Sequence, residues 1–300
     1  MPTISVIIPT YGTPTFLEDS IKSVQRQTFT DWELIIVDDN NPDTDARNTT
    51  EKIVSRYIDN DKRIKYIKHS KNRNGAAARN TGFAIAQGKF IAFLDSDDEY
   101  MPNRLQKCYD ALLKAPKVIA GVYTGCEFRR SRKTYLRYTD VVDGNFLIET
   151  LACKFMFCTG SNIFIRKDVV DELNGFDETF LRHQDYEFLV RVFERYSLKA
   201  IQEILVIKNN ENINVPKVEK QISIKKQYLD KYHYLIEKLS QKEVKHIMHA
   251  NYIGIAEIAM AQNEFKVARI YYNMAQKNGG LSIKEWSRRL IFPLYNLLRR

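Results

Sequence analysis

The sequence predicts an α/β protein, with a mostly parallel sheet flanked by helices and a C-terminal all-helical extension. Three observations lead to this prediction. The first half of the chain alternates short β-branched runs with helical periods, which is the pattern of βαβ units. Two of the apolar runs end in aspartate clusters, at residues 38–39 and 95–98. From about residue 218 the β-branched runs stop, and helical periodicity continues to the end.

The first βαβ unit is visible at the N-terminal end of the sequence. Ile4 to Ile8 is a candidate for a buried strand. A helix is expected next, because Leu17, Ile21 and Val24 are spaced four and three residues apart. Leu34 to Val37 is the second apolar strand, and the connection is expected to be right-handed.

The following elements repeat this alternation. Lys65 to Lys68 is a weaker strand, Gly75 to Gln87 an alanine-rich helix and Phe90 to Leu94 a strong strand. Pro102 is expected to start a helix, because proline is tolerated in a first turn. Further strands are expected at Val118 to Tyr123, Asn162 to Ile165 and Ile204 to Ile207.

The C-terminal part of the chain is expected to be a helical region. A boundary near residues 209–216 divides an α/β domain, 1–215, from a helical region, 216–300. Three apolar stripes at helical spacing are predicted to bury against one another. They are Tyr228, Tyr232, Leu235 and Leu239; Met248, Tyr252, Ile255 and Ala259; and Phe265, Ala268, Tyr272 and Ala275.

Composition indicates a folded protein with an anionic partner. The chain has 300 residues, 44% hydrophobic and 28% charged, which is ordinary for a globular protein with a full core. Its net charge of +9 favours nucleic acid, a phosphorylated ligand or an acidic membrane surface. The 4 cysteines show no metal-binding spacing, so we expect reduced thiols in a reducing cytoplasm.

Neither a signal peptide nor a transmembrane helix is expected. The N-terminus lacks a basic segment followed by a long apolar stretch. No apolar run reaches the roughly 18 residues that a bilayer requires. We therefore expect a cytoplasmic protein, and leave open a peripheral contact with the inner membrane face.

The two aspartate clusters are the strongest candidates for a site. In open α/β sheets, ligands bind beyond the carboxyl ends of strands, where Asp38-Asp39 and Asp95-Ser96-Asp97-Asp98 are expected. The clustered carboxylates repel one another unless a cation compensates, and Mg²⁺ or Mn²⁺ prefers such oxygen ligands. A solvated acidic turn that caps the next helix is the alternative, favoured for Asp98 or Glu99 taken alone.

A basic segment, Lys71 to Asn80, is a candidate partner of the acidic site. Gly75 opens a helix whose first amide groups favour an anion, and Arg73 and Arg79 could hold diphosphate oxygens. Solvation in a loop is the simpler interpretation of Lys71. For Arg79, an ion pair in the core and contact with a ligand are equally open.

A third candidate group precedes a predicted helix. Asp185 follows Arg182, His183 and Gln184 and stands where an N-cap residue would, so capping is a real alternative to catalysis. A carboxylate that can approach a hydroxyl group can nevertheless act as a general base.

Taken in order, these motifs resemble glycosyltransferase family 2, the inverting enzymes with the Rossmann-like GT-A fold. The resemblance covers roughly residues 3 to 200, and the order of its segments is more specific than any single one. The segments are Ser5 to Tyr11, Glu33 to Asp39, Asn74 to Gly82, Phe93 to Asp98 with Met101-Pro102, Asn174 to Glu178, and Gln184 to Glu187.

The resemblance assigns a role to each candidate residue. It implies that Pro9, Thr10 and Tyr11 line the nucleotide pocket and that Asp39 accepts a hydrogen bond from uracil, which favours UDP. It also places Arg73, Arg79, Asp95 and Ser96 on the donor side. Asp95 is implied to contact the ribose or brace the metal.

The resemblance also implies the metal ligands and the catalytic base. Asp97 would ligate Mn²⁺ or Mg²⁺ with help from Asp98, and this metal stabilises the departing UDP. Asp185 would deprotonate the acceptor hydroxyl as it attacks the anomeric carbon. Many relatives have Glu-Asp where this chain has Gln184-Asp185, so a role for the first acid is absent.

The implied activity is metal-dependent transfer of a hexosyl or N-acetylhexosaminyl group, with inversion, from a UDP-sugar to a glycan or lipid-linked acceptor. Surface polysaccharide synthesis, such as that of a capsule, fits this activity. A sugar-nucleotide nucleotidyltransferase is the alternative, but its usual Gly-rich basic loop is missing near the N-terminus. An alternative that is not an enzyme is a nucleic-acid-binding protein. The sequence contains no recognisable nucleic-acid-binding motif, so we expect no nucleic acid partner.

The last residues form a basic and aromatic segment outside the resemblance. Residues 284–300 contain five basic residues against one acid, a net charge of +4. The segment 282–300 could lie on an anionic membrane or pack as a docking helix, and both remain open. The helical tail could also form a homo-oligomer.

Overall fold

The computed structural model describes residues 1–209 and 215–287, and the chain divides into two compact units. The first unit contains Met1–Asn145 and Met156–Ile213, and the second contains Phe146–Phe155 and Asn214–Arg300. The expected division into a catalytic domain, 1–215, and a helical region, 216–300, stays a prediction about function.

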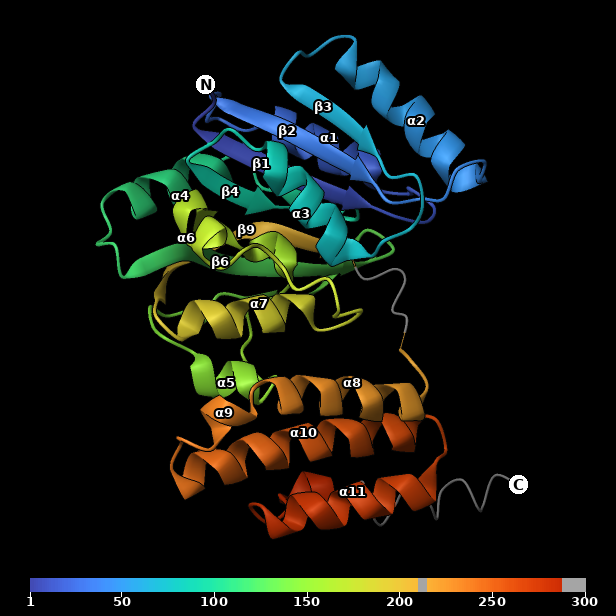
Figure 1. Cartoon of the computed structure of the whole chain (residues 1–300), viewed down its shortest axis with the longest axis vertical. Coiled ribbons are helices and arrows are strands. Elements are labelled where there is room, and N and C mark those ends of the chain that lie inside the picture. Colours follow the sequence, from blue (N-terminus) through green and yellow to red (C-terminus); the bar gives the residue numbers. More distant parts are fainter. Residues whose placement is uncertain (210–214, 288–300) are drawn as a thin grey trace. The chain divides into compact units, whose positions relative to one another are not determined.

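The first unit is built on a 9-stranded mixed sheet with the order β3-β2-β1-β4-β8-β6-β9-β5, with β7 paired to β6 (Figure 1). Strands β3, β2, β1 and β4 are parallel to one another. The strands are β1 Ile4–Thr10, β2 Trp32–Asp38, β3 Ile64–Lys68, β4 Phe90–Phe93, β5 Asp98–Tyr100, β6 Ile119–Arg130, β7 Lys133–Tyr138, β8 Phe164–Arg166 and β9 Ser197–Asn209.

Helices cover both faces of the parallel part, which explains its unbroken apolar runs. Even-numbered positions of β1, such as Val6, share a core with Leu17 and Ile21 of α1, while Ile7 faces α3. Gly82 allows α3 this close approach, because a Cβ there would lie 2.6 Å from Ile7 Cγ2. The helices are α1 Leu17–Gln25, α2 Asp45–Ile58, α3 Gly75–Ile85, α4 Arg104–Leu113, α6 Lys167–Glu172 and α7 Gln184–Phe193.

Several element boundaries differ from the sequence prediction. The strand expected at 118–123 continues as β6 to Arg130, because it pairs with β7, β8 and β9 along its length. The strand expected from Asn162 begins at Phe164, because Gly160–Asn162 form a 3-10 turn. The helix expected from Pro102 begins at Arg104. Helix α2 and the short strands β5 and β7 were not predicted.

The second unit is helical, and its core combines buried members of the predicted apolar stripes, such as Ile255, Ala259 and Ala275, with residues outside them, such as Ile253 and Ala256. Tyr228, Tyr232 and Tyr272 are fully or nearly fully buried. Residues 146–155 belong to this unit, because Tyr228 donates a hydrogen bond to the Thr150 carbonyl at 2.8 Å and Asn251 donates one to the Leu151 carbonyl at 3.0 Å. The helices are α5 Leu147–Leu151, α8 Val218–Lys231, α9 His233–Ile236, α10 Gln241–Ala261 and α11 Phe265–Lys277.

The predicted basic segment 282–300 lies mostly outside the described residues, which end at residue 287. In the described part, Ile283 is 90% exposed and Trp286 is 38% exposed. Among the described residues, no helix combines the length and the apolar character that crossing a bilayer requires.

Candidate functional site

The acidic site lies where β4 ends and β5 begins. Asp95, Asp97 and Asp98 each offer a carboxylate oxygen, and these oxygens lie within 4.8 Å of one another. Asp97 is exposed, Asp95 is half-buried and Asp98 is fully buried. The residues that the sequence grouped by their spacing are therefore also together in space.

Asp98 is bonded to protein groups on both of its oxygens. Oδ2 accepts hydrogen bonds from Ser161 Oγ at 2.6 Å and Thr159 Oγ1 at 3.1 Å, and Oδ1 accepts one from the Asn209 amide at 3.2 Å. Burial raises the pKa of Asp98 to about 7, although Lys208 opposes this shift. A solvated turn, the alternative considered for this residue, does not fit a side chain that is 0% exposed.

Asp95 is held by an arginine from α3. Arg79 donates from Nη2 to Asp95 Oδ1 at 2.6 Å, and Asp95 Oδ2, 3.0 Å from Thr159 Oγ1, shares the single hydroxyl proton of Thr159 with Asp98 Oδ2. Burial raises the pKa of Asp95, but the charges of Arg79 and Lys208, together with the hydrogen bonds from Arg79 and Thr159, outweigh burial and hold this pKa below its usual value. Arg79 itself is 7% exposed and also donates to Gln184 Oε1 at 3.1 Å. Two interpretations were left open for Arg79, and the structure shows the ion pair in the core. Contact between Arg79 and a bound ligand stays a prediction.

Asp185 lies in the first turn of α7 and does not cap it. The residue before the helix is His183, with a left-handed φ of 60°, so the capping alternative is wrong. Asp185 Oδ1 is buried and has no hydrogen-bond partner among the described residues. Burial raises the pKa of Asp185, while the Arg79 charge opposes the shift. The site thus holds a carboxylate oxygen that is free to accept a proton.

Gly160 lies directly against this carboxylate. A Cβ on Gly160 would come within 2.7 Å of Asp185 Oδ1, closer than real Cβ contacts. The 3-10 turn that contains Gly160 also carries Ser161, whose hydroxyl binds Asp98 and accepts from the Asp95 amide at 2.9 Å. One short turn therefore joins the base candidate to the acidic site.

Lys208 is a member of the site that the sequence analysis missed. It pairs across the strands with Asp98, and its Nζ lies 3.8 Å from Asp98 Oδ2 and 3.3 Å from Thr159 Oγ1. Its positive charge helps to hold the pKa of Asp95 below its usual value, and it partly offsets the burial that raises the pKa values of Asp97 and Asp98. Burial lowers the pKa of Lys208, but these acids outweigh burial and raise it. A lysine at a strand end gives no signal in a sequence, because the pairing that places it joins distant segments.

Asp39, at the end of β2, organises the loop that leads to α3. It is 2% exposed and accepts four short hydrogen bonds. The donors are His69 Nδ1 at 2.7 Å, the Arg73 amide at 2.8 Å, Asn72 Nδ2 at 2.8 Å and the Asn74 amide at 2.9 Å. Each carboxylate oxygen therefore has two protein donors, and the predicted contact with uracil stays a prediction.

The other residues expected to contact the nucleotide-sugar lie near the same edge of the sheet. Thr10, at the end of β1, is 2% exposed and its hydroxyl has no partner among the described residues, whereas Tyr11 is 65% exposed. Arg73 forms an exposed ion pair with Glu178 at 3.0 Å. Helix α3 is capped by Asn74, whose Oδ1 accepts from the Ala76 and Ala77 amides. Pro9 and Ser96 are half-buried beside these ends.

Comparison with known proteins identifies the family of this chain. The model of the family described as "Glycosyl transferase family 2" matches residues 5–173. An uncharacterised glycosyltransferase of Methanocaldococcus jannaschii is 31% identical over 84% of this chain and 83% of its own. The Escherichia coli enzyme WfgD, named as a UDP-Glc:α-D-GlcNAc-diphosphoundecaprenol β-1,3-glucosyltransferase, is 30% identical over 66% of this chain and 72% of its own.

Solved structures share the fold at low sequence identity. Staphylococcus aureus TarS 1–349 in complex with UDP-GlcNAc has a TM-score of 0.59 and 16% identity, over 99% of this chain and 92% of that chain. The mannosyltransferase PcManGT of Pyrobaculum calidifontis in complex with GDP-Man and Mn²⁺ has a TM-score of 0.58 and 18% identity, over 100% of this chain and 81% of that chain.

Proposed function

Because the chain belongs to glycosyltransferase family 2 and has the GT-A fold, we propose that it transfers a sugar from a UDP-sugar to a hydroxyl of a lipid-linked or glycan acceptor, with inversion and with a divalent metal. That it is a glycosyltransferase follows from its family. The donor, the metal, the stereochemistry and a place in surface polysaccharide synthesis are the proposal.

The observation that carries the proposal is the charge balance of the site. Four carboxylates, those of Asp95, Asp97, Asp98 and Asp185, face two cations, Arg79 and Lys208. If all are ionised, the formal charge is −2, which one divalent cation neutralises. The oxygen ligands within 4.8 Å of one another suit Mg²⁺ or Mn²⁺, which prefer carboxylates and keep positions open for phosphate oxygens.

The names of similar proteins support the donor and the acceptor. WfgD is named for UDP-glucose and a diphosphoundecaprenol acceptor, and TarS was solved with UDP-GlcNAc. PcManGT was solved with GDP-Man and Mn²⁺. GDP-mannose is therefore the donor against which UDP-sugars should be compared. Within this chain, Pro9, Thr10, Tyr11, Asp39 and Ser96 are proposed to bind the nucleotide.

In this proposal Asp97 holds the metal with help from Asp98, and Asp95 braces it; the metal would supply positive charge to the departing diphosphate. Asp185 is proposed to accept the proton of the acceptor hydroxyl. The hydroxyl oxygen forms a bond to the anomeric carbon as the bond from that carbon to the UDP oxygen breaks. The raised pKa of Asp185 makes its carboxylate a better base than an exposed aspartate, and Arg79 keeps it ionised before the proton arrives.

The remaining proposals concern organisation and location. Residues 1–215 are proposed to be catalytic and residues 216–300 to be an accessory helical region. A lipid-linked acceptor would bring the protein to the inner membrane face as a peripheral protein. Contact through 282–300, or a homo-oligomer formed by the helical tail, remains part of this proposal.

Donor screening tests the proposed function. Purified protein is incubated with Mn²⁺ and a panel of UDP-sugars, with GDP-mannose and EDTA as comparisons, and release of the nucleoside diphosphate is measured. We expect release from a UDP-sugar that EDTA abolishes and that Asp97→Ala lacks, with Glu219→Ala in the second unit as a control variant. Release from GDP-mannose alone would overturn the UDP assignment. Release of pyrophosphate from a nucleoside triphosphate and a sugar phosphate would support the nucleotidyltransferase instead.

A further inference from the structure

The Lys208 ammonium has hydrogen-bonding capacity that the protein does not use. An ammonium group carries three N–H donors. Among the described residues, Lys208 Nζ forms one hydrogen bond, to Thr159 Oγ1 at 3.3 Å, and its distance of 3.8 Å from Asp98 Oδ2 is too long for a second. The side chain is 24% exposed, so a ligand in the acidic site can reach the remaining donors.

The charge of Lys208 acts on the whole site. It attracts the three clustered carboxylates. Burial raises the pKa of Asp185, and the charges of Arg79 and Lys208 oppose that shift. The ammonium is therefore within electrostatic range of the proposed metal ligands and of the proposed base. The β-phosphate of a sugar donor is joined to the anomeric carbon, so it is the phosphate expected between these groups.

The groups that the sequence analysis assigned to the diphosphate are already bonded to protein acceptors. Arg79 is 7% exposed and donates to Asp95 and Gln184. Arg73 forms an ion pair with a glutamate. Two amide groups in the first turn of α3 are bonded to the Asn74 side chain. Each of these groups would have to give up a protein acceptor to bind a phosphate, whereas Lys208 would not.

The charge balance of the site also leaves Lys208 available. The four carboxylates and two cations have a formal charge of −2, which the proposed divalent cation neutralises. Lys208 is then no longer needed to compensate the carboxylates. A nucleoside diphosphate brings new negative charge into the site, and the unused donors of Lys208 can bind it.

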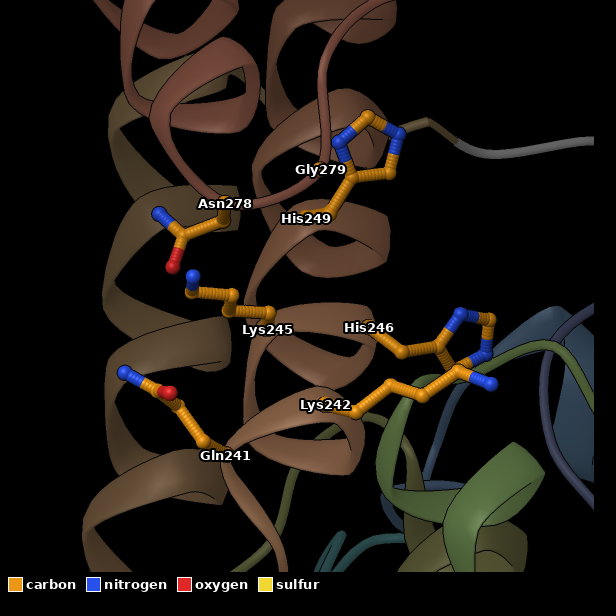
Figure 2. Close-up of a pocket in the computed structure, with 7 residues that line it drawn as sticks. All are labelled: Gln241, Lys242, Lys245, His246, His249, Asn278 and Gly279. Carbon is orange, nitrogen blue, oxygen red and sulfur yellow. The ribbon is translucent and has the colours of Figure 1, made fainter.

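A second group of basic side chains, on the second unit, is not arranged in this way. Lys242, Lys245 and His246 of α10 line a hollow there. In Figure 2, Lys245 extends towards Asn278, whereas Lys242 and His246 extend to the other side of α10. Because these side chains diverge, a small anion would not contact them all. Lys208 is therefore the stronger candidate for a phosphate contact.

We propose that Lys208 is a catalytic residue that binds the β-phosphate of the sugar donor, an inference that rests on the proposed function. As the acceptor oxygen bonds to the anomeric carbon, the electron pair of the broken bond stays on the β-phosphate oxygen, and the acceptor proton passes to Asp185. The Lys208 ammonium keeps its own protons and donates a hydrogen bond to this phosphate. That bond strengthens as the phosphate gains negative charge.

Calorimetry with UDP and UMP tests this contact, because UMP lacks the β-phosphate. Mn²⁺ is saturating throughout, so that all variants are compared at the same metal occupancy. We expect Lys208→Met to bind UDP about tenfold more weakly or worse, and UMP about threefold more weakly at most. Lys208→Arg keeps the charge and the donors, so its UDP affinity should stay within about threefold of that of the unsubstituted protein. The control, Lys199→Met, removes an exposed lysine from the same strand and should change neither affinity.

Turnover gives a second measurement. With a UDP-sugar identified by the donor screen, kcat at saturating donor and Mn²⁺ is expected to fall about tenfold or more in Lys208→Met and to be largely retained in Lys208→Arg. A lysine that only neutralised the carboxylates would not distinguish UDP from UMP. UMP binding by Lys208→Met shows that its nucleotide site is folded, and Lys208→Gln replaces this variant if methionine prevents folding.

Two results overturn the proposal. One is an equal loss of UDP and UMP affinity in Lys208→Met, and the other is a UDP affinity that is the same in Lys208→Met and Lys208→Arg. Either result, with UDP still bound in the presence of Mn²⁺, removes only the role of Lys208 and leaves the proposed function intact. Unsubstituted protein that binds neither UDP nor GDP with Mn²⁺ would instead defeat the proposed function, and this inference with it.

Discussion

Replacing Lys208 with methionine is expected to destabilise the metal-free protein. Methionine keeps the unbranched stem, so the change removes mainly the charge. The Lys208 ammonium lies 3.8 Å from Asp98 Oδ2, and its side chain is 24% exposed. Two unit charges about 4 Å apart interact by about 4 kcal/mol near a protein surface.

The net loss is smaller than this Coulomb energy. Desolvation of the ammonium offsets part of the attraction, and the acids can take up a proton when Lys208 is absent. We therefore expect the free energy of unfolding in EDTA at pH 8 to fall by about 2 kcal/mol, half the Coulomb energy.

Mn²⁺ is expected to offset most of this loss. The formal charge of the site changes from −2 to −3 in Lys208→Met, so the ion meets one more uncompensated carboxylate. We expect the dissociation constant for Mn²⁺ to fall about tenfold, which corresponds to about 1.4 kcal/mol. Lys208→Arg retains the charge and serves as the control, with unfolding free energy and Mn²⁺ affinity close to those of the unsubstituted protein.

Urea unfolding and calorimetry measure the two quantities. Trp32 is buried in β2 and reports on the first unit, and a Trp286→Phe background removes the second of the 2 tryptophans. Equal unfolding free energies of Lys208→Met and Lys208→Arg in EDTA would refute the reasoning. So would Mn²⁺ binding that is unchanged or weaker, because Lys208 would then not compensate the same carboxylates.

Three further predictions follow from contacts in the first unit. Asp185→Asn is expected to lower transfer by about 10²–10⁴-fold with UDP affinity unchanged by calorimetry, because only proton acceptance is lost; full activity would place the base elsewhere. Gly160→Ala is expected to displace that carboxylate, since the added Cβ would lie 2.7 Å from Oδ1, and to lower kcat at least tenfold while UDP still binds; an unchanged kcat contradicts this. Burial raises the pKa of Glu127, but hydrogen bonds from Thr134, Arg137 and Arg129 outweigh it and hold this pKa at about 2, below its ordinary 4.5. Its contribution to stability is therefore complete above pH 4.5 and is lost as the pH falls through about 2. Because Arg137 is 67% exposed, we expect this contribution to be about 1–2 kcal/mol. It is measured as the difference in acid unfolding between the unsubstituted protein and Glu127→Gln, and parallel pH curves would disprove it.

The parallel part of the fold could be predicted because its signal is local. Two strands, Ile4 to Ile8 and Leu34 to Val37, are buried on both faces of the sheet, and their sequences are therefore almost continuously apolar. The aspartates that follow such runs lie at the carboxyl edge of the sheet by geometry alone. The family resemblance added roles to these residues, which their positions by themselves do not supply.

Features that depend on pairing between distant segments could not be predicted. Lys208 enters the site because β5 pairs with β9, and the bond from the Asn209 amide to Asp98 joins residues 111 positions apart. Residues 146–155 belong to the helical unit through side-chain bonds to main-chain carbonyls, whose partners a sequence does not show. Two of the four donors to Asp39 are likewise main-chain amides.

The aspartates of the site differ in how much hydrogen-bonding capacity they have left. Asp98 accepts three hydrogen bonds from protein groups. The Asp97 carboxylate is exposed and accepts no hydrogen bond from another described residue. A metal needs carboxylate oxygens with unused lone pairs, so this difference favours Asp97 as the ligand and gives Asp98 a supporting role.

Paired alanine substitutions separate these two roles. Asp98→Ala leaves the Ser161 hydroxyl and the Asn209 amide without this acceptor, while the Thr159 hydroxyl keeps Asp95 as an acceptor. We expect the unfolding free energy in EDTA to fall by about 2 kcal/mol. For the Asp97 carboxylate, burial and repulsion by Asp95 outweigh the attraction of Lys208. The unfolding free energy of Asp97→Ala in EDTA should therefore be unchanged or higher, while Mn²⁺ binding and turnover are lost. If Asp97→Ala lost stability and Asp98→Ala lost only Mn²⁺ binding, the two assignments would have to be exchanged.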